Sequence, residues 1–364
     1  EKGDIMNPLK LVCIGGGTGL STLLRGFKLF NKSNSEQSKI INMNWLTAIV
    51  SVADDGGSTG RLIEEFDVLP PGDIRNCMVA LSNEDEIMSQ IFSYRFKGEG
   101  LLGGHNVGNL LLIALIELNN GSFPKAIEEA SKVLAVQGRI LPVTLEHTTL
   151  CAQLEDGEVV EGESQIPKRR NRAPIKRVFL IPRGNGKNGQ IIQQINPSED
   201  YQVKAHKQAV DAIQKADAII IGPGSLYTSI LPNLAVKEIA DSIKKVSVPK
   251  IYVCNIMSQP GETDGYSVSD HVNAIKQHTD FLPDYVIVNQ EIAPRNIIEE
   301  YMKEELQEQF ARIKLHADEA IGTLDMDTYA SETLIKLIKT INKISLDTSH
   351  MVDTTTVSYT HLTL

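Results

Sequence analysis

The sequence predicts an α/β protein with a doubly wound, mostly parallel, Rossmann-like sheet and a small β-hairpin insertion. Short β-rich apolar runs alternate with helical patterns along most of the 364 residues. The runs carry apolar residues on both faces, as strands do when helices cover a parallel sheet on both sides. Glycine-rich or polar clusters follow these runs directly, at the carboxyl ends of the strands, where such sheets bind ligands.

The predicted strands and helices follow one another from the first run onward. "KLVCI" precedes a helix near residues 20–30, and "LTAIVSV" precedes helical segments around "DIRNCMVAL" and "EIMSQIFSYRF". Three later runs, "ADAIIIG", "PKIYVCNI" and "PDYVIVN", are each followed by a helix-like stretch. Beyond about residue 292 the pattern predicts polar helices.

One segment interrupts the alternation. Segments with the alternating pattern of β-strands flank Asp156 and Gly157, a pair that favours the tight turns of β-hairpins. We therefore expect a small antiparallel region over about residues 141–196. This insertion belongs to a single domain over residues 6–330. The two ends, residues 1–5 and 351–364, are interpreted as non-native.

Charge, cysteine content and apolar stretches bear on nucleic-acid binding, on the redox compartment and on membrane association. A net charge of -10 argues against a body that wraps nucleic acid, and the basic run at residues 168–177 lacks interleaved aromatics. Four widely spaced cysteines without a CxxC pair predict buried thiols and a reducing cytoplasm. The longest apolar stretch, at residues 110–118, is too short to span a bilayer, and no secretory signal is recognised, so no membrane partner is expected.

The first glycine-rich turn joins the first strand to the first helix. In "CIGGGTGLS" the glycines permit positive φ angles and close approach of the backbone, and the helix start offers N–H groups to a phosphate. The match to GxGxxG is imperfect because Leu20 stands where the third glycine belongs. The ligand-binding candidates here are Gly15, Gly16, Gly17, Thr18 and Gly19.

An acid pair follows the second strand in "ADDGGSTGR". Asp54 is a candidate for holding a ribose hydroxyl, or Asp54 and Asp55 together hold Mg²⁺ directly or through water. Alternatively, Asp55 is only a turn former before two glycines.

Two further clusters precede helices. In "PPGDIRN", Asp73 is interpreted as a helix cap, and Arg75 is placed to face the site one turn later. In "GGHNVGNLL", Asn106 and Asn109 are ligand candidates, because one cap does not account for two asparagines and three glycines. His105 is interpreted as a structural histidine.

A second glycine-rich turn, "GPGS", follows the "ADAIIIG" strand. Gly222, Gly224 and Ser225 can present N–H groups and a hydroxyl to an anion. After the next strand, Asn255 is a further ligand candidate. Ser267 and Asp270 match a capping box, which leaves Tyr266 just outside the helix and available to a ligand.

Taken together, "IGGGTGLS", "VSVADDGGSTGRL", "PPGDIRN", "GGHNVGNLL", "GPGSLYTSILPNL" and "MSQPGETDGYSVSDH" resemble the gluconeogenesis-factor (YvcK-type) family, which is related to 2-phospho-L-lactate transferase (CofD-like). The resemblance covers roughly residues 10–290. An Arg-His-Asp triplet of the family pattern does not occur after Gln290.

The resemblance implies a cytoplasmic protein that binds a UDP-sugar such as UDP-N-acetylglucosamine and supports growth on gluconeogenic carbon sources and normal cell shape. It assigns the nucleotide-sugar contact to both glycine-rich turns, the acid pair, the two asparagines and Tyr266. The alternative is a Mg²⁺-dependent transferase acting on a nucleoside diphospho-substrate. No catalytic residue is assigned, since no nucleophile is paired with a base, and a homo-oligomer is left open.

Overall fold

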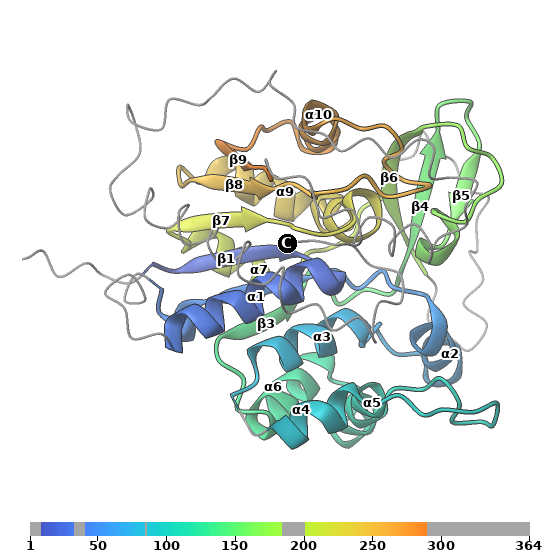
Figure 1. Cartoon of the computed structure of the whole chain (residues 1–364), viewed down its shortest axis with the longest axis vertical. Coiled ribbons are helices and arrows are strands. Elements are labelled where there is room, and N and C mark those ends of the chain that lie inside the picture. The colour runs from blue at the N-terminus through green and yellow to red at the C-terminus, as the bar shows by residue number, and fades with distance from the viewer. Residues whose placement is uncertain (1–8, 33–40, 84–85, 184–200, 290–364) are drawn as a thin grey trace, which may run out of the picture.

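The computed structural model describes residues 9–32, 41–83, 86–183 and 201–289. Its centre is a six-stranded sheet in the order β3-β2-β1-β7-β8-β9, in which every neighbouring pair is parallel (Figure 1). The strands are β1 (Leu11–Gly15), β2 (Thr47–Val50), β3 (Arg139–Pro142), β7 (Ala218–Ile221), β8 (Lys250–Val253) and β9 (Tyr285–Ile287). The predicted fold class is confirmed.

The central strands are buried on both faces. Every residue of β1, β2 and β7 is buried, which agrees with their largely apolar sequences. The register places Ile14 beside Ile49 of β2 on one side and Ile221 of β7 on the other. The hydrophobic core therefore runs continuously through the middle of the sheet.

Helices cover the sheet and extend below it in Figure 1. Helix α1 packs on α3, α7 packs on α9, and α5 forms a hairpin with α6. The helices are α1 (Gly17–Lys32), α2 (Gly57–Phe66), α3 (Gly72–Leu81), α4 (Glu86–Ser93), α5 (Val107–Leu118), α6 (Phe123–Val133), α7 (Lys207–Gln214), α8 (Leu231–Leu234), α9 (Lys237–Lys245) and α10 (Val268–Thr279). Short turns of helix are η2 (Met43–Trp45), η3 (Glu163–Gln165) and the π-helix η4 (Leu226–Ile230).

A three-stranded antiparallel sheet, in the order β5-β4-β6, lies to one side of the main sheet (Figure 1). It consists of β4 (Thr148–Leu154), β5 (Val159–Glu161) and β6 (Ile175–Pro182), and the predicted hairpin turn joins β4 to β5. Its start differs from the expected boundary, because Leu141 pairs with Ile49 and so belongs to the main sheet. Residues 184–196 of the expected insertion lie outside the described residues, as do the chain ends and the helices expected beyond residue 292.

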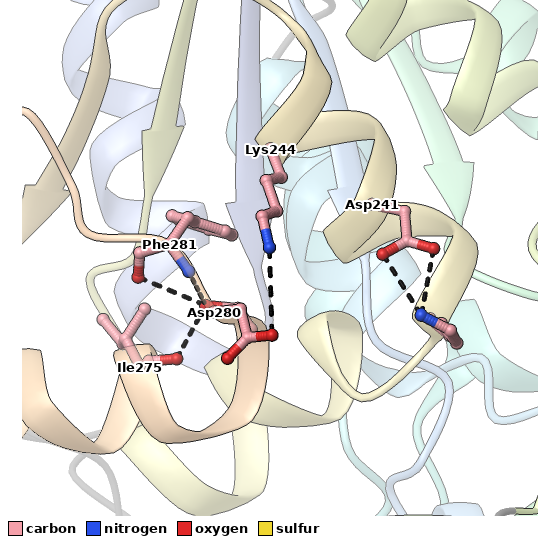
Figure 2. A network of polar contacts seen from close by, with 7 residues as sticks. Asp241, Lys244, Ile275, Asp280 and Phe281 are labelled. Atoms are coloured by element: carbon pink, nitrogen blue, oxygen red, sulfur yellow. Dashed lines mark hydrogen bonds and ion pairs between the residues drawn. The ribbon is translucent and has the colours of Figure 1, made fainter.

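Figure 2 shows a polar network at the ends of α9 and α10. The Lys244 ammonium lies 3.8 Å from Asp280, and Lys237 pairs with Asp241 at 3.1 Å. The Thr279 hydroxyl donates to the Ile275 carbonyl at 2.7 Å. The charged groups are exposed, so each pair contributes little, about 0–1 kcal/mol.

Two further expectations concern cysteines and membrane spans. Cys13, Cys77, Cys151 and Cys254 are buried free thiols, as predicted. In the described parts of the chain, no helix combines the length and the apolar character that crossing a bilayer requires.

Candidate functional site

The arrangement of the strands singles out one edge of the main sheet. From β1 the chain moves to β2 on one side, and it later adds β7 on the other side of β1. In open parallel sheets this change of direction opens a crevice at the carboxyl ends of the two strands, where ligands bind. Both glycine-rich turns follow strands that flank this point.

The two turns touch each other. A Cβ atom placed on Gly19 would lie 2.7 Å from the carbonyl oxygen of Pro223 and 2.9 Å from Cα of Gly224. A Cβ on Gly224 would lie 3.3 Å from the carbonyl oxygen of Gly16. Only glycine permits this approach of backbone to backbone, and the two turns therefore lie together at one edge of the sheet.

The first turn is anchored from both sides of the sheet. The Gly15 carbonyl accepts hydrogen bonds from the Ser51 N–H and from Asn233 Nδ2, each at 3.0 Å. Gly17 opens α1 at a φ of 61°, a left-handed conformation that favours glycine. The turn is thus held in place by contacts within the chain.

Asp73 faces the first turn, which corrects its interpretation as a helix cap. The N-cap of α3 is Pro71, and no side chain caps that helix. A Cβ on Gly16 would lie 2.5 Å from Asp73 Oδ2, and the Gly17 N–H donates to the Asp73 carboxylate. Burial, and next the charge of Asp54, raise the pKa of Asp73 to about 7. The carboxylate lies where the sequence predicted a phosphate contact.

The acid pair is turned toward two different neighbours. Asp54 Oδ1 accepts the Gly56 N–H at 2.9 Å, and burial raises the pKa of Asp54. Asp55 Oδ1 instead accepts the Ser164 N–H of η3 at 2.8 Å. Asp55 therefore ties the small sheet to the main one, a role that the sequence did not indicate.

A metal at the acid pair needs ligands from elsewhere. Within the described residues, no three side chains of the His, Cys, Asp and Glu types gather into a metal-binding group. Mg²⁺ prefers octahedral oxygen ligands, often one or two carboxylates with phosphate oxygens. Asp54 fits such a shared site better than Asp55, because Asp55 is bound to η3. Magnesium binding stays a prediction.

Arg75 places a positive charge between these acids. It is 8% exposed, and its guanidinium donates to Asn109 Oδ1 at 3.2 Å and to Asn76 Oδ1 at 2.5 Å. Burial lowers the pKa of Arg75 to about 10, although Asp73 and Asp54 counteract this shift. The predicted ligand residue Asn109 is thereby joined to the acids through Arg75.

Asn106 and His105 have protein partners. Asn106 is the N-cap of α5, accepting the Asn109 N–H at 3.2 Å, and its Nδ2 donates to the Ser93 carbonyl at 2.9 Å. The buried His105 lies 3.1 Å from the Ser58 hydroxyl through Nδ1. Both contacts agree with structural roles at the start of α5.

The second turn is braced by two polar side chains. Asn255 accepts the Gly224 N–H at 3.2 Å and donates to the Gly224 carbonyl at 2.8 Å. Glu262 accepts the Tyr227 N–H at 3.3 Å and the Thr228 hydroxyl at 3.0 Å. Ser225 lies between these contacts, as the N-cap of η4.

Sequence reasoning missed Glu262. It is 4% exposed, and burial raises its pKa to about 7. Its carboxylate accepts hydrogen bonds from Tyr227 and Thr228 at the start of η4, where an anion is favoured. Burial also raises the pKa of Glu163, with a further contribution from the charges of Asp54 and Glu262. In "PGETDG" a glutamate has no signal that separates it from a solvated loop residue.

Tyr266 belongs to an aromatic cluster. Its hydroxyl lies 2.8 Å from the Tyr227 hydroxyl, and its ring meets Tyr227 and His271 edge to face at 6.2 and 5.5 Å between centroids. The predicted capping box of Ser267 and Asp270 is present. The structure thus gives Tyr266 packing partners, and its contact with a ligand stays a prediction.

A small cavity of about 30 Å³ lies beside the acid pair. Asp54, Asp55, His147, Thr148 and Arg183 contribute to its polar lining. Thr148 Oγ1 is buried and has no hydrogen-bond partner among the described atoms. The volume and polarity suit a single water molecule.

The family becomes evident once this geometry is compared with known proteins. The family model described as 2-phospho-L-lactate transferase CofD matches residues 11–333. The chain belongs to this family. A crystal structure of a Bacillus halodurans protein superposes with a TM-score of 0.73 at 39% identity, covering 92% of this chain and 99% of that one.

Curated members of the family are also similar in sequence. A Bacillus subtilis relative named gluconeogenesis factor is 45% identical over 297 residues, which are 81% of this chain and 83% of the relative. A Nostoc relative is 49% identical over 266 residues, which are 73% of this chain. The chain spans 51% of the length of the Nostoc relative and 61% of a Clostridium acetobutylicum relative.

Proposed function

We propose that this protein is a gluconeogenesis factor that binds a nucleoside diphosphate sugar, UDP-N-acetylglucosamine in the first instance. In this role it supports growth on gluconeogenic carbon sources, cell shape and cell-wall regulation in the cytoplasm. The observation that carries the proposal is the contact between the two glycine-rich turns at the point where the sheet changes direction. Glycine turns at such a point bring backbone N–H groups to a diphosphate.

The acids beside the turns support a nucleotide sugar over a simple anion. Burial raises the pKa values of Asp54 and Asp73, and Asp73 lies against the first glycine-rich turn. Carboxylates in this position accept hydrogen bonds from ribose or sugar hydroxyls. A ligand with both a diphosphate and hydroxyl groups satisfies both parts of the site.

Calorimetric titration tests the proposal. We expect UDP-N-acetylglucosamine to bind more tightly than GDP or NADP, each titrated with and without Mg²⁺. Gly16→Ala places a methyl group against the Asp73 carboxylate and should weaken binding at least about tenfold, about 1.4 kcal/mol. Gly15→Ala is the matched control, because its Cβ meets neighbours only at 3.5 Å or more. Equal losses in both variants, or no binding by the parent protein, would refute the assignment.

A second candidate function is a Mg²⁺-dependent transferase that acts on a nucleoside diphospho-substrate. The observation in its favour is Asp54, whose carboxylate fits a metal shared with phosphate oxygens. Cys13 is buried in β1, and burial raises the pKa of its thiol far above the usual range, so this thiol does not provide a nucleophile for a covalent route. We expect no time-dependent release of UDP or UMP. Release that Asp55→Ala abolishes would favour the transferase.

Asp54→Asn separates a ligand role from a structural one. The variant keeps the size of the side chain and an oxygen for the Gly56 N–H, so we expect normal thermal stability. Binding that depends on Mg²⁺ or on the ribose should weaken. Unchanged affinity in a stable variant would make Asp54 a structural residue.

A further inference from the structure

The basic run of the insertion touches loops on two sides of the candidate site. We define residues 162–173 as the strap. Near its start, the Ser164 N–H donates to Asp55 Oδ1, in the loop that follows β2. Further along, the Arg169 guanidinium donates to the Gly261 carbonyl, in the loop that follows β8. Because both loops follow the carboxyl ends of parallel strands, the strap lies at the edge of the sheet that carries the site.

The strap is held in one conformation by its own arginines. Arg169 also donates to the Ala173 carbonyl at 3.0 Å, and Arg172 donates to the Pro167 carbonyl at 2.8 Å. Gly261 packs so closely on the strap that a Cβ atom there would collide with the Pro167 carbonyl. These contacts fix the backbone from which the remaining basic side chains of the strap extend.

Two of these basic side chains are exposed and carry unpaired charge. Lys168 and Arg170 lie on either side of Arg169 in the sequence, and both are exposed. Neither takes part in an ion pair within the part of the chain that the structure describes. On a chain with a net charge of -10, they form a local region of positive potential beside the site.

The interior of the candidate site carries the opposite charge. Burial raises the pKa values of Asp54 and Asp73, and the buried Arg75 guanidinium counteracts this only in part. Burial also raises the pKa of Glu163, and the charges of Asp54 and Glu262 raise it further. A diphosphate that approaches these acids meets like charge, so positive charge at the rim of the site speeds its arrival.

We propose that Lys168 and Arg170 attract the diphosphate of the ligand toward the candidate site and so raise its rate of association. This inference rests on the proposed function, in which the ligand is a nucleoside diphosphate sugar. Charges act over about 10 Å at 0.1 M ionic strength. Burial raises the pKa of Glu262, and Arg169, which lies between the two cations in sequence, is near enough to counteract this shift. The strap cations thus start from a segment that lies beside the site.

Stopped-flow mixing at two salt concentrations tests the proposal, with a UDP-N-acetylglucosamine derivative that carries a neutral fluorophore. The double variant Lys168→Gln with Arg170→Gln should associate about threefold to tenfold more slowly than the parent at about 20 mM salt. At about 500 mM salt the difference should disappear, because ions then screen the charges. The dissociation rate should change less than twofold, since neither side chain holds the bound ligand.

The matched control removes the same charge from the opposite edge of the sheet. Lys215 and Lys245 are exposed at the ends of α7 and α9, where the chain enters β7 and β8. Lys215→Gln with Lys245→Gln should leave the association rate within twofold of the parent at both salt concentrations, because only the net charge of the chain changes.

The outcomes separate this inference from the proposed function. A parent protein that binds no UDP-N-acetylglucosamine at either salt concentration would refute the proposed function, and this inference with it. Binding by the parent at a rate that salt does not change would overturn the inference alone. So would an equal loss of rate in the two double variants, or a loss that appears only in the dissociation rate.

Discussion

The two glycine-rich turns meet at one edge of the sheet but are held in different ways. The second turn is braced by side chains, with Asn255 bonded to both polar groups of Gly224 and Glu262 bonded to the start of η4. The first turn faces one titratable side chain, Asp73, beside Gly16. Side-chain hydrogen bonds therefore hold the second turn rigidly. At the first turn, the charge of the Asp73 carboxylate can change with its surroundings.

The largest expected effect comes from separating the two turns. Gly19→Ala puts a methyl group 2.7 Å from a backbone oxygen of Pro223, which cannot rotate away. Strain of this kind typically costs about 1–3 kcal/mol of unfolding free energy, and the shifted turns should also bind UDP-N-acetylglucosamine at least about tenfold more weakly. Thermal unfolding and calorimetry measure the two effects. Normal stability and normal affinity would show that the contact between the turns is dispensable.

The second prediction concerns the charge that braces the second turn. The pKa of Glu262 is about 7 in the folded chain, against an ordinary value of 4.5, so between these pH values the folded state binds more protons than the unfolded state. Its contribution to stability therefore falls as the pH rises from 4.5 to 7, by about 1.4 kcal/mol per pH unit at most. Glu262→Gln should make the unfolding free energy depend less steeply on pH in this window. An unchanged slope from urea unfolding would contradict the assignment.

The third prediction concerns the protonation of the Asp73 carboxylate at the first turn. A diphosphate near Asp73 adds negative charge and raises its pKa further above 7, so binding at pH 7 should take up a fraction of a proton. Calorimetry in buffers of different ionisation enthalpy measures this uptake, and Asp73→Asn should reduce it. Asp241→Asn, in the exposed network of Figure 2, is the control that should leave the uptake unchanged. Equal uptake in the Asp73 variant and the parent would exclude Asp73 as the proton acceptor.

The smallest effect is expected at Tyr266, behind the second turn. Tyr266→Phe removes a hydroxyl pair at 2.8 Å and keeps both ring contacts, so it should lower the unfolding free energy by about 0.5–1.5 kcal/mol. Affinity for UDP-N-acetylglucosamine should change less than threefold, whereas Tyr266→Ala should reduce it about tenfold or more if the ring stacks on the ligand. An alanine variant that binds like the parent, or that unfolds, would assign Tyr266 to packing alone.

Much of the fold could be predicted because buried parallel strands leave a local signal. The runs at β1, β2, β7 and β8 are mainly apolar, and each is followed by a helical pattern. The expected insertion wrongly includes Leu141 and Pro142, the last two residues of β3, because this short segment carries no sign of its partner strand. Only the pairing of Leu141 with Ile49 joins it to the main sheet.

The positions of the two glycine-rich turns were predictable because each turn directly follows a strand with a clear apolar signal. Asp73 was interpreted as a cap because an acid one residue after Pro-Gly fits a helix start equally well, and only its distance from Gly16 shows the difference. Glu262 and the bond from Ser164 to Asp55 depend on contacts between distant segments. A single sequence read locally contains no record of such contacts.

The placement of β1 between β2 and β7 has a consequence for synthesis of the chain. Asn233 donates to the Gly15 carbonyl across 218 residues, and β7 pairs with β1 across a similar span. A ribosome must therefore release the chain beyond this asparagine before the first turn gains its second anchor. Until then the nascent chain holds β1 with an unpaired edge, and non-local pairing of this kind forms slowly. The candidate site is thus completed late, and a chain interrupted before β7 lacks it altogether.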